Sequence, residues 1–168
     1  MNKCKICGSE DIQVIKYGEI DYFKCSSCRT MYLTEIPDSN ALIGYYRKNY
    51  KITSEDFSET EYRRIFRLPE QIRLIKEITD IKKPPAKLID IGCDKGFFLD
   101  EARRAGFSVI GVEPSESARK YCETININCF KTAEEVKEKQ DIAVMWHSLE
   151  HHGDPLYSLY EIKEILNP

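Results

Sequence analysis

Residues 88–113 constrain the fold of this chain more than any other stretch. They read as an apolar strand, a turn that contains Gly92 and Gly96, an amphipathic helix, and a second apolar strand that ends at Glu113. Two strands joined by a helix in this way indicate an α/β fold with a parallel sheet and right-handed crossovers. Ligands bind such sheets at the carboxyl ends of the strands, and turn glycines let the backbone approach a ligand closely. The stretch therefore predicts a crevice that binds a nucleoside.

The acidic residues in and beside this turn indicate which kind of nucleoside ligand the crevice binds. A dinucleotide-binding turn has the pattern G-x-G-x-x-G, with a helix N-terminus that faces a pyrophosphate. Here Asp94 takes the place of the middle glycine, and its carboxylate would repel a pyrophosphate. Asp90 and Asp94 together suit a ligand that carries an amino group and a sulfonium. Glu113 can accept hydrogen bonds from two ribose hydroxyls.

The turn resembles motif I of the class I S-adenosylmethionine-dependent methyltransferases, and it reads Asp90-x-Gly92-x-Asp94-x-Gly96 in this chain. Family members usually have glycine where Asp94 stands. A generic strand–turn–helix with incidental glycines is the alternative interpretation of this one match. The resemblance implies a Rossmann-like fold that binds S-adenosylmethionine, with Ala133 at the adenine pocket. The cofactor-binding residues that it implies are Asp90, Gly92, Cys93, Asp94, Gly96, Glu113, Ala133 and His147.

A second stretch has the same family character. Ile142–Trp146 is a buried-strand candidate, and His147-Ser148-Leu149-Glu150-His151 follows it. At Asp154-Pro155 a helix is expected to start, with Asp as N-cap and Pro at the first helical position. This order resembles the segment after the fourth strand of many small-molecule methyltransferases, so the resemblance covers about residues 87–168. The expected helix has an apolar stripe of Leu156, Leu159, Tyr160, Ile162, Ile165 and Leu166.

His147 is the candidate catalytic residue, a general base that would take a proton from the methyl acceptor. Glu150 and His151 are second choices, and a structural or cofactor-facing role is the alternative for His147. The segment lacks the Asp/Asn-Pro-Pro-Tyr/Phe stretch that accompanies methylation of base amino groups in related enzymes. We therefore expect a small-molecule acceptor, such as a sugar or lipid intermediate. An RNA methyltransferase and an inactive zinc-ribbon binding module are the alternatives.

The N-terminal cysteines form a separate motif, Cys4-x-x-Cys7 and Cys25-x-x-Cys28. Paired cysteines at this spacing predict a four-cysteine zinc ribbon, in which four thiolates close the tetrahedron and make the zinc structural. Short strands are expected on both sides of Gly18 and at residues 31–33. Two disulfides or a redox pair are the alternatives. The odd total of seven cysteines and the lack of a signal peptide favour zinc, a reducing compartment and a cytoplasmic location.

Three cysteines lie outside the ribbon motif. Cys93 falls in the ligand turn, where it is expected to touch the cofactor. Cys122 falls in a predicted helix that Ser115 or Ser117 caps, and Cys129 falls in a short strand predicted at residues 127–130. Both of these are expected to be buried packing residues.

Charge and hydropathy limit the partners. The formal net charge is −3, so the chain has no overall attraction for nucleic acid, and its local basic clusters are expected to be solvated faces. No apolar run reaches the length of a membrane span. The expected partner is therefore the small-molecule acceptor, with no membrane.

The chain is predicted to divide into a zinc ribbon at residues 1–36, a helical linker at 37–85, and a partial Rossmann-like domain at 86–168. Ser39, Ser58 or Thr60 and Pro69 mark helix starts in the linker, which the proline pair at 84–85 ends. Tyrosines of this linker would cover the cofactor or substrate, or pack on the sheet.

The sequence stops where the resembling family usually continues with further strands. We therefore expect a truncated product or a half-domain that another chain completes. Residues 142–146 would then form an exposed edge strand, and such an edge favours self-association or a partner chain.

Overall fold

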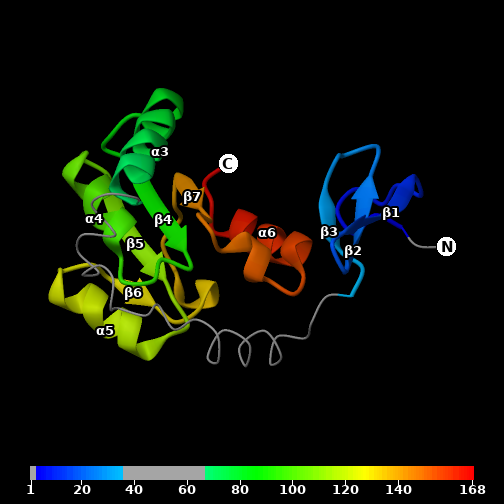
Figure 1. The fold of residues 1–168 in the computed structure, drawn as a ribbon. Coiled ribbons are helices and arrows are strands. Elements are labelled where there is room, and N and C mark those ends of the chain that lie inside the picture. The colour runs from blue at the N-terminus through cyan, green and yellow to red at the C-terminus, as the bar shows by residue number, and fades with distance from the viewer. Residues whose placement is uncertain (1–2, 36–66) are drawn as a thin grey trace. The chain divides into compact units, whose positions relative to one another are not determined.

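The computed structural model describes residues 3–35 and 67–168 (Figure 1). The chain divides into two compact units, one of residues 1–51 and 152–158 and the other of residues 52–151 and 159–168. Most of the predicted linker, residues 37–66, lies outside the described residues, so its first two helices and the three domain boundaries stay predictions. In the described part of the chain, no helix is long and apolar enough to cross a membrane.

The N-terminal sheet has three antiparallel strands in the order β1-β2-β3. They are β1 (Ile12–Tyr17), β2 (Ile20–Cys25) and β3 (Met31–Leu33). Gly18 has a φ of +62° in the turn that joins β1 to β2, as a tight hairpin requires. The strands agree with the prediction. They bury little, since Val14, Tyr17, Ile20 and Met31 are exposed.

The second sheet is parallel and has the order β6-β5-β4-β7. Its strands are β4 (Lys87–Ile91), β5 (Ser108–Val112), β6 (Cys129–Phe130) and β7 (Ile142–Val144). The chain runs outward from β4 to β6 and then returns to the other side of β4, so the strand order reverses beside β4. This is the Rossmann-like parallel sheet that the sequence predicts. The third and fourth strands are shorter than the predicted 127–130 and 142–146.

Helices lie on both faces of this sheet (Figure 1). The helices are α3 (Leu68–Ile81), α4 (Phe97–Arg104), α5 (Glu116–Thr124) and α6 (Pro155–Glu164), with short 3-10 turns at Ala133–Glu135 and Leu149–His151. Successive side chains of a strand point to opposite faces. Leu88 accordingly packs in one core with residues of α3, α4 and α5, and Ile89 packs in the other with Ile162 of α6.

The apolar stripe predicted for α6 is only partly buried. Ile162 is 5% exposed, whereas Leu159 is 42% and Tyr160 is 60% exposed. Asp154 is the N-cap as predicted, and its Oδ1 accepts a hydrogen bond from Tyr157 N at 2.9 Å.

Strand β7 ends the strand order among the described residues, as the predicted edge strand would. Its outer side is not wholly unpaired, because Gln140, just before β7, forms an isolated parallel bridge with Leu166. Gln140 N donates to Ile165 O at 2.9 Å, and Asn167 N donates to Gln140 O at 2.7 Å. The edge strand was predicted for residues 142–146, so this bridge lies just before it.

Candidate functional site

The turn after β4 has an unusual backbone. Gly92, Asp94 and Gly96 all have positive φ, at +79°, +48° and +73°. Gly92 and Gly96 adopt this region without steric cost, and aspartate is one of the few other residues that does so readily. Gly96 is the N-cap of α4. Three left-handed residues in five therefore fold the turn tightly over the carboxyl end of β4.

Glu113 lies directly after β5 and connects two loops. Its Oε2 accepts a hydrogen bond from Asp94 N at 3.0 Å, and its Oε1 accepts one from Ser115 N at 2.7 Å. Burial raises the pKa of Glu113, against the lowering effect of these two amides. Each carboxylate oxygen has a second lone pair, so Glu113 can hold the turn and still accept hydrogen bonds from a ligand.

Asp90 is the most unusual polar residue of the sheet. It is 3% exposed, and its Oδ1 is buried without a hydrogen-bond partner among the described residues. Burial, with smaller effects from Cys129 and Glu113, raises the pKa of Asp90 to about 8. An unpartnered buried carboxyl group costs free energy, and a donor or cation supplied by a ligand would remove that cost.

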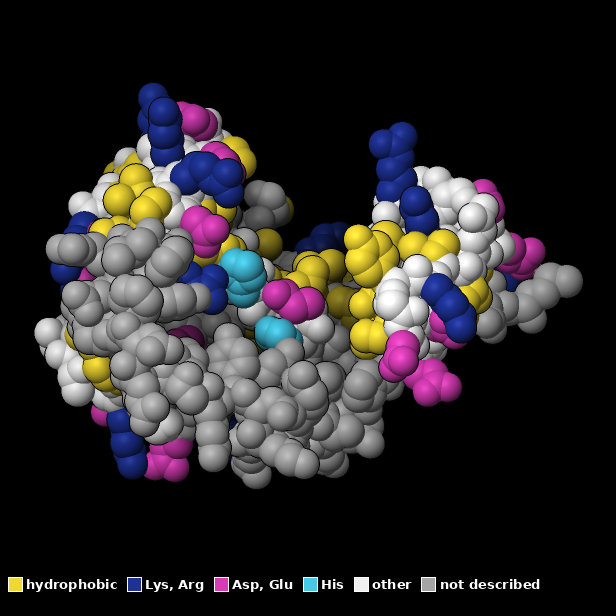
Figure 2. All heavy atoms as spheres, in the orientation of Figure 1, with side chains coloured by type: hydrophobic (Ala, Val, Ile, Leu, Met, Phe, Trp, Pro, Cys, Tyr) yellow, Lys and Arg dark blue, Asp and Glu magenta, His cyan; other side chains and the backbone are white. Residues whose placement is uncertain are grey.

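The loop after β7 carries His147. The His147 side chain is 56% exposed, and its Nδ1 lies 3.7 Å from Glu150 Oε1. Histidine side chains are visible on the surface drawn in Figure 2. The preceding Trp146 packs against Phe98, with ring centroids 5.9 Å apart, and the Arg67 guanidinium lies 5.9 Å from the Trp146 ring centroid. The loop is thus anchored on one side while the imidazole faces solvent.

Ser148 connects this loop to the turn after β4, and this contact was not predicted from the sequence. The Ser148 hydroxyl is buried and donates a hydrogen bond to Ile91 O at 2.5 Å. A Cβ at Gly92 would lie 2.6 Å from Ser148 Cβ. Gly92 is therefore needed for this close approach as well as for its φ. A small residue beside His147 was the only sequence signal, and it does not indicate burial.

The predicted cofactor residues follow four parallel strands. Residues 92–96 come after β4, Glu113 after β5, Ala133 after β6, and His147 after β7. Carboxyl ends of parallel strands meet at one edge of a sheet. The structure therefore brings these residues to a common edge, and Asp90 is the next-to-last residue of β4. Cys93 is buried, and its Sγ lies 3.4 Å from Cys129 Sγ.

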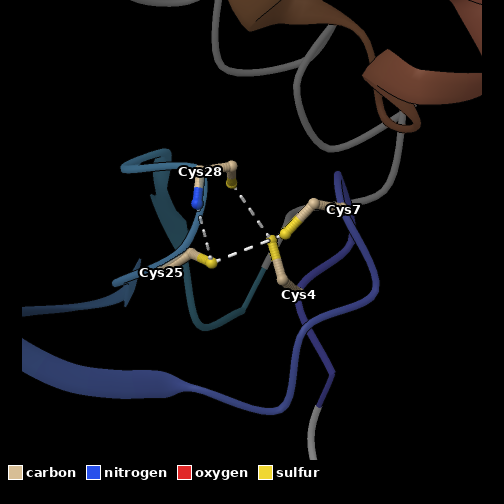
Figure 3. Close-up of side chains that lie close together, drawn as sticks. All are labelled: Cys4, Cys7, Cys25 and Cys28. Atoms are coloured by element: carbon tan, nitrogen blue, oxygen red, sulfur yellow. Dashed lines mark hydrogen bonds between the residues drawn. The ribbon is translucent and has the colours of Figure 1, made fainter.

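The four N-terminal cysteines converge as the spacing predicts (Figure 3). All four Sγ atoms lie within 4.8 Å of one another. The Cys4–Cys28 and Cys7–Cys25 Sγ distances are 3.7 Å and 3.6 Å. The hydroxyl and the amide of Thr30 lower the pKa of Cys28 to about 6, which favours a thiolate ligand. The donor set and its geometry fit a tetrahedral zinc ion.

Comparison with known proteins gives a consistent result. A family model described as a methyltransferase domain matches residues 60–168. The ubiquinone biosynthesis O-methyltransferase of Actinobacillus pleuropneumoniae serotype 5b (strain L20) is 33% identical in an alignment of 97 residues, and the match covers 49% of this chain and 42% of that protein. The chain thus spans less than half the length of that curated relative.

Solved structures share the fold. The plantazolicin methyltransferase BpumL, in complex with a triazolic desmethylPZN analog and SAH, has a TM-score of 0.60 and 17% identity over 77% of this chain and 54% of its own. Magnesium protoporphyrin IX methyltransferase (ChlM) from Synechocystis PCC 6803, with bound SAM, has a TM-score of 0.56 and 14% identity over 81% of this chain and 75% of its own. At these identities the likeness concerns the fold alone.

Proposed function

The chain belongs to the methyltransferase-domain family, and from this premise we propose that it binds S-adenosylmethionine and transfers the methyl group to a small molecule. The observation that carries the proposal is the arrangement of two carboxyl groups at one sheet edge. Glu113 holds the glycine turn through Asp94 N, and Asp90 lies buried with an unpartnered oxygen. A ligand with a ribose diol and two positive groups matches this arrangement.

Each side chain of the edge has a separate role in this proposal. Asp90 supplies an acceptor oxygen in a desolvated position, and a bound ammonium or sulfonium beside it would favour its ionised form. Glu113 accepts the ribose hydroxyls. The bound cofactor supplies an electrophilic methyl carbon on a good leaving group. Positioning of the acceptor then provides much of the rate.

His147 is the residue that we propose to take a proton from the acceptor. Its imidazole is exposed at the same edge, and Glu150 Oε1 lies 3.7 Å from its Nδ1. Ser148 and Trp146 hold the backbone on each side of it. A hydroxyl acceptor needs such a base, and the O-methyltransferase named above suggests a hydroxyl.

A small-molecule acceptor is supported by the charge distribution. Basic and acidic side chains are interspersed over the described residues on the face drawn in Figure 2, and the net charge is −3. Tight binding of nucleic acid needs a positive surface that contacts several phosphates. The names of the relatives, which concern ubiquinone, plantazolicin and protoporphyrin, point the same way.

Cys4, Cys7, Cys25 and Cys28 are proposed to hold one zinc ion with a structural role. The ribbon sheet has many exposed apolar residues and a small core, so metal binding would supply much of its folding free energy. Zinc binding needs reduced thiols, and on that ground we propose a reducing, cytoplasmic location.

Calorimetric titration with S-adenosylhomocysteine tests the cofactor assignment. Glu113→Ala should weaken binding by about 1.5–3 kcal/mol, the range for a hydrogen bond to a charged group. Glu116→Ala is the matched control, because Glu116 is an exposed glutamate paired with Lys120 on α5 and should leave the affinity unchanged. Equal binding by Glu113→Ala and wild type, or binding of NAD, would contradict the proposal.

A further inference from the structure

A second cluster of thiols lies in the methyltransferase unit. Cys93 follows β4, Cys122 belongs to α5, and Cys129 belongs to β6, and their Sγ atoms lie within 4.8 Å of one another. The Sγ atoms of Cys93 and Cys129 are only 3.4 Å apart. Three separate elements therefore bring three sulfur atoms together directly beneath the proposed cofactor turn.

Two glycines provide the space for these sulfurs. A Cβ at Gly111 of β5 would lie 2.4 Å from Cys93 Sγ and 3.2 Å from Cys129 Sγ. A Cβ at Gly96 would lie 3.0 Å from Cys122 Sγ. Since any larger residue at position 111 would displace a sulfur, the close approach of Cys93 to Cys129 is built into the packing of the sheet.

The three thiols differ in access and reactivity. Cys93 and Cys122 are 6% and 0% exposed, whereas Cys129 is half-buried. Hydrogen bonds from Cys93 and then Cys122 lower the pKa of Cys129, with help from Arg119, although burial and Glu113 oppose this. The pKa of Cys93 is raised, first by its hydrogen bond to Cys129 and then by burial. Cys129 is therefore the more accessible thiol of the pair, and its lowered pKa favours the thiolate.

We propose that Cys129 and Cys93 are an oxidisable pair that forms a reversible disulfide on reaction with a hydroperoxide. The Cys129 thiolate attacks the O–O bond and releases hydroxide or alkoxide, which leaves a sulfenic acid on Cys129. The Cys93 sulfur then attacks that sulfur and releases water. Two thiols thus lose two electrons, and the hydroperoxide is reduced to an alcohol or water. A thiol reductant reverses the reaction.

A disulfide suits this position better than a bound metal ion. Three thiolates around a divalent ion would leave a net charge of −1 in this buried place beside Glu113, and burial of a charge is costly. A disulfide is neutral. Its formation requires the distance between the two sulfurs to shorten from 3.4 Å to about 2.05 Å. Both sulfurs lie next to Gly111, where no side chain separates them.

Oxidation would act on the cofactor turn, and this consequence rests on the proposed function. Cys93 lies between Gly92 and Asp94, and Asp94 N donates to Glu113 at 3.0 Å. Movement of Cys93 toward β6 would pull this amide away from the Glu113 carboxylate. The oxidised chain should therefore bind S-adenosylhomocysteine more weakly than the reduced chain.

The test uses the full chain, reduced or treated with hydrogen peroxide, then alkylated and mapped by mass spectrometry. A cross-link between the peptides of Cys93 and Cys129 is expected, with fragmentation used to separate Cys129 from Cys122. It should persist in Cys122→Ala and disappear in Cys129→Ser. Peroxide should weaken binding of S-adenosylhomocysteine about tenfold, equivalent to about 1.4 kcal/mol. Dithiothreitol should restore it, and Cys129→Ser should bind normally before and after peroxide.

The outcomes separate this inference from the proposed function. Failure of the cross-link to form while the reduced chain binds S-adenosylhomocysteine would overturn the inference alone. A cross-link that leaves the affinity for S-adenosylhomocysteine unchanged would overturn the inference that the disulfide alters the turn after β4. A second metal ion per chain that Cys129→Ser loses would identify the cluster as a metal site and overturn the pair. A reduced chain that does not bind S-adenosylhomocysteine would overturn the proposed function.

Discussion

At the scale of single residues, the close approach of Gly92 and Ser148 gives the sharpest expectation. Gly92→Ala places a Cβ 2.6 Å from Ser148 Cβ at a φ of +79°. Overpacking and left-handed strain should together lower the free energy of unfolding by about 2–4 kcal/mol. Urea denaturation measures this.

A double-mutant cycle separates the two causes. In a Ser148→Gly background the clash is absent, so Gly92→Ala should cost only the backbone strain, about 1–2 kcal/mol. An equal cost in both backgrounds would show that the two residues do not touch.

Asp90 makes stability depend on pH. Burial raises its pKa to about 8 in the folded chain, while in the unfolded chain the pKa stays near 3.8, the ordinary value of an aspartate. Between these pH values the unfolded state has lost the proton and the folded state retains it. Stability should therefore fall as pH rises, by up to about 1.4 kcal/mol per pH unit from this group.

Asp90→Asn should make stability fall less steeply as pH rises, because it removes the ionisable group and keeps the shape of the side chain. Asp80→Asn, at an exposed aspartate of α3, is the control and should keep the decline. Thermal melting of the three proteins between pH 5 and pH 8 is the measurement. A decline that Asp90→Asn leaves unaltered would locate its origin elsewhere.

At the scale of elements, Ser115 illustrates how a local sequence signal translates into structure. It is the N-cap of α5, and its Oγ accepts a hydrogen bond from Ala118 N at 3.5 Å. Ser115→Ala should lower the free energy of unfolding by about 0.5–1 kcal/mol, the lower part of the range for such caps, because this bond is long. Ser108→Ala is the control, since Ser108 is an exposed serine of β5, outside α5. Similar urea midpoints for the two variants would contradict the assignment.

The elements also show what the sequence could and could not predict. Periodicity and capping residues gave α4, α5 and the start of α6, because those signals act within a few residues. Strand ends were less accurate: Ile127 N bonds back to Cys122 O, so β6 begins only at Cys129. The apolar stripe of α6 overestimated burial, since Tyr160 stays exposed.

The candidate site likewise has residues that could be predicted from the sequence and residues that could not. Glu113 could be placed from sequence because its distance from the turn is typical of the family. Ser148 and the three-thiol cluster could not, because each depends on contacts between elements far apart in the chain. The missing hydrogen-bond partner of Asp90 Oδ1 could not be predicted either, because it depends on how other elements bury this side chain.

At the scale of the whole molecule, the chain should behave as two folding units with different requirements. Elemental analysis of protein purified without chelator should give one zinc per chain, and Cys25→Ser should lose it while Cys122→Ala keeps it. Chelation should remove hydrogen-exchange protection from residues 12–33, because metal affinity supplies the folding free energy of the ribbon. Residues 87–112, with their own apolar core, should stay protected. A metal-free ribbon that keeps its protection would contradict this expectation.

The hydrogen bond from Ser148 to Ile91 has a kinetic consequence for the proposed transferase. The loop that carries His147 cannot swing away from the sheet without breaking this bond and relaxing the backbone beside Gly92. A movement of that loop that releases the methylated product would therefore also weaken the binding of S-adenosylhomocysteine. Such a mechanical link favours a release order in which the product leaves first and the cofactor follows, and product inhibition patterns would reveal that order.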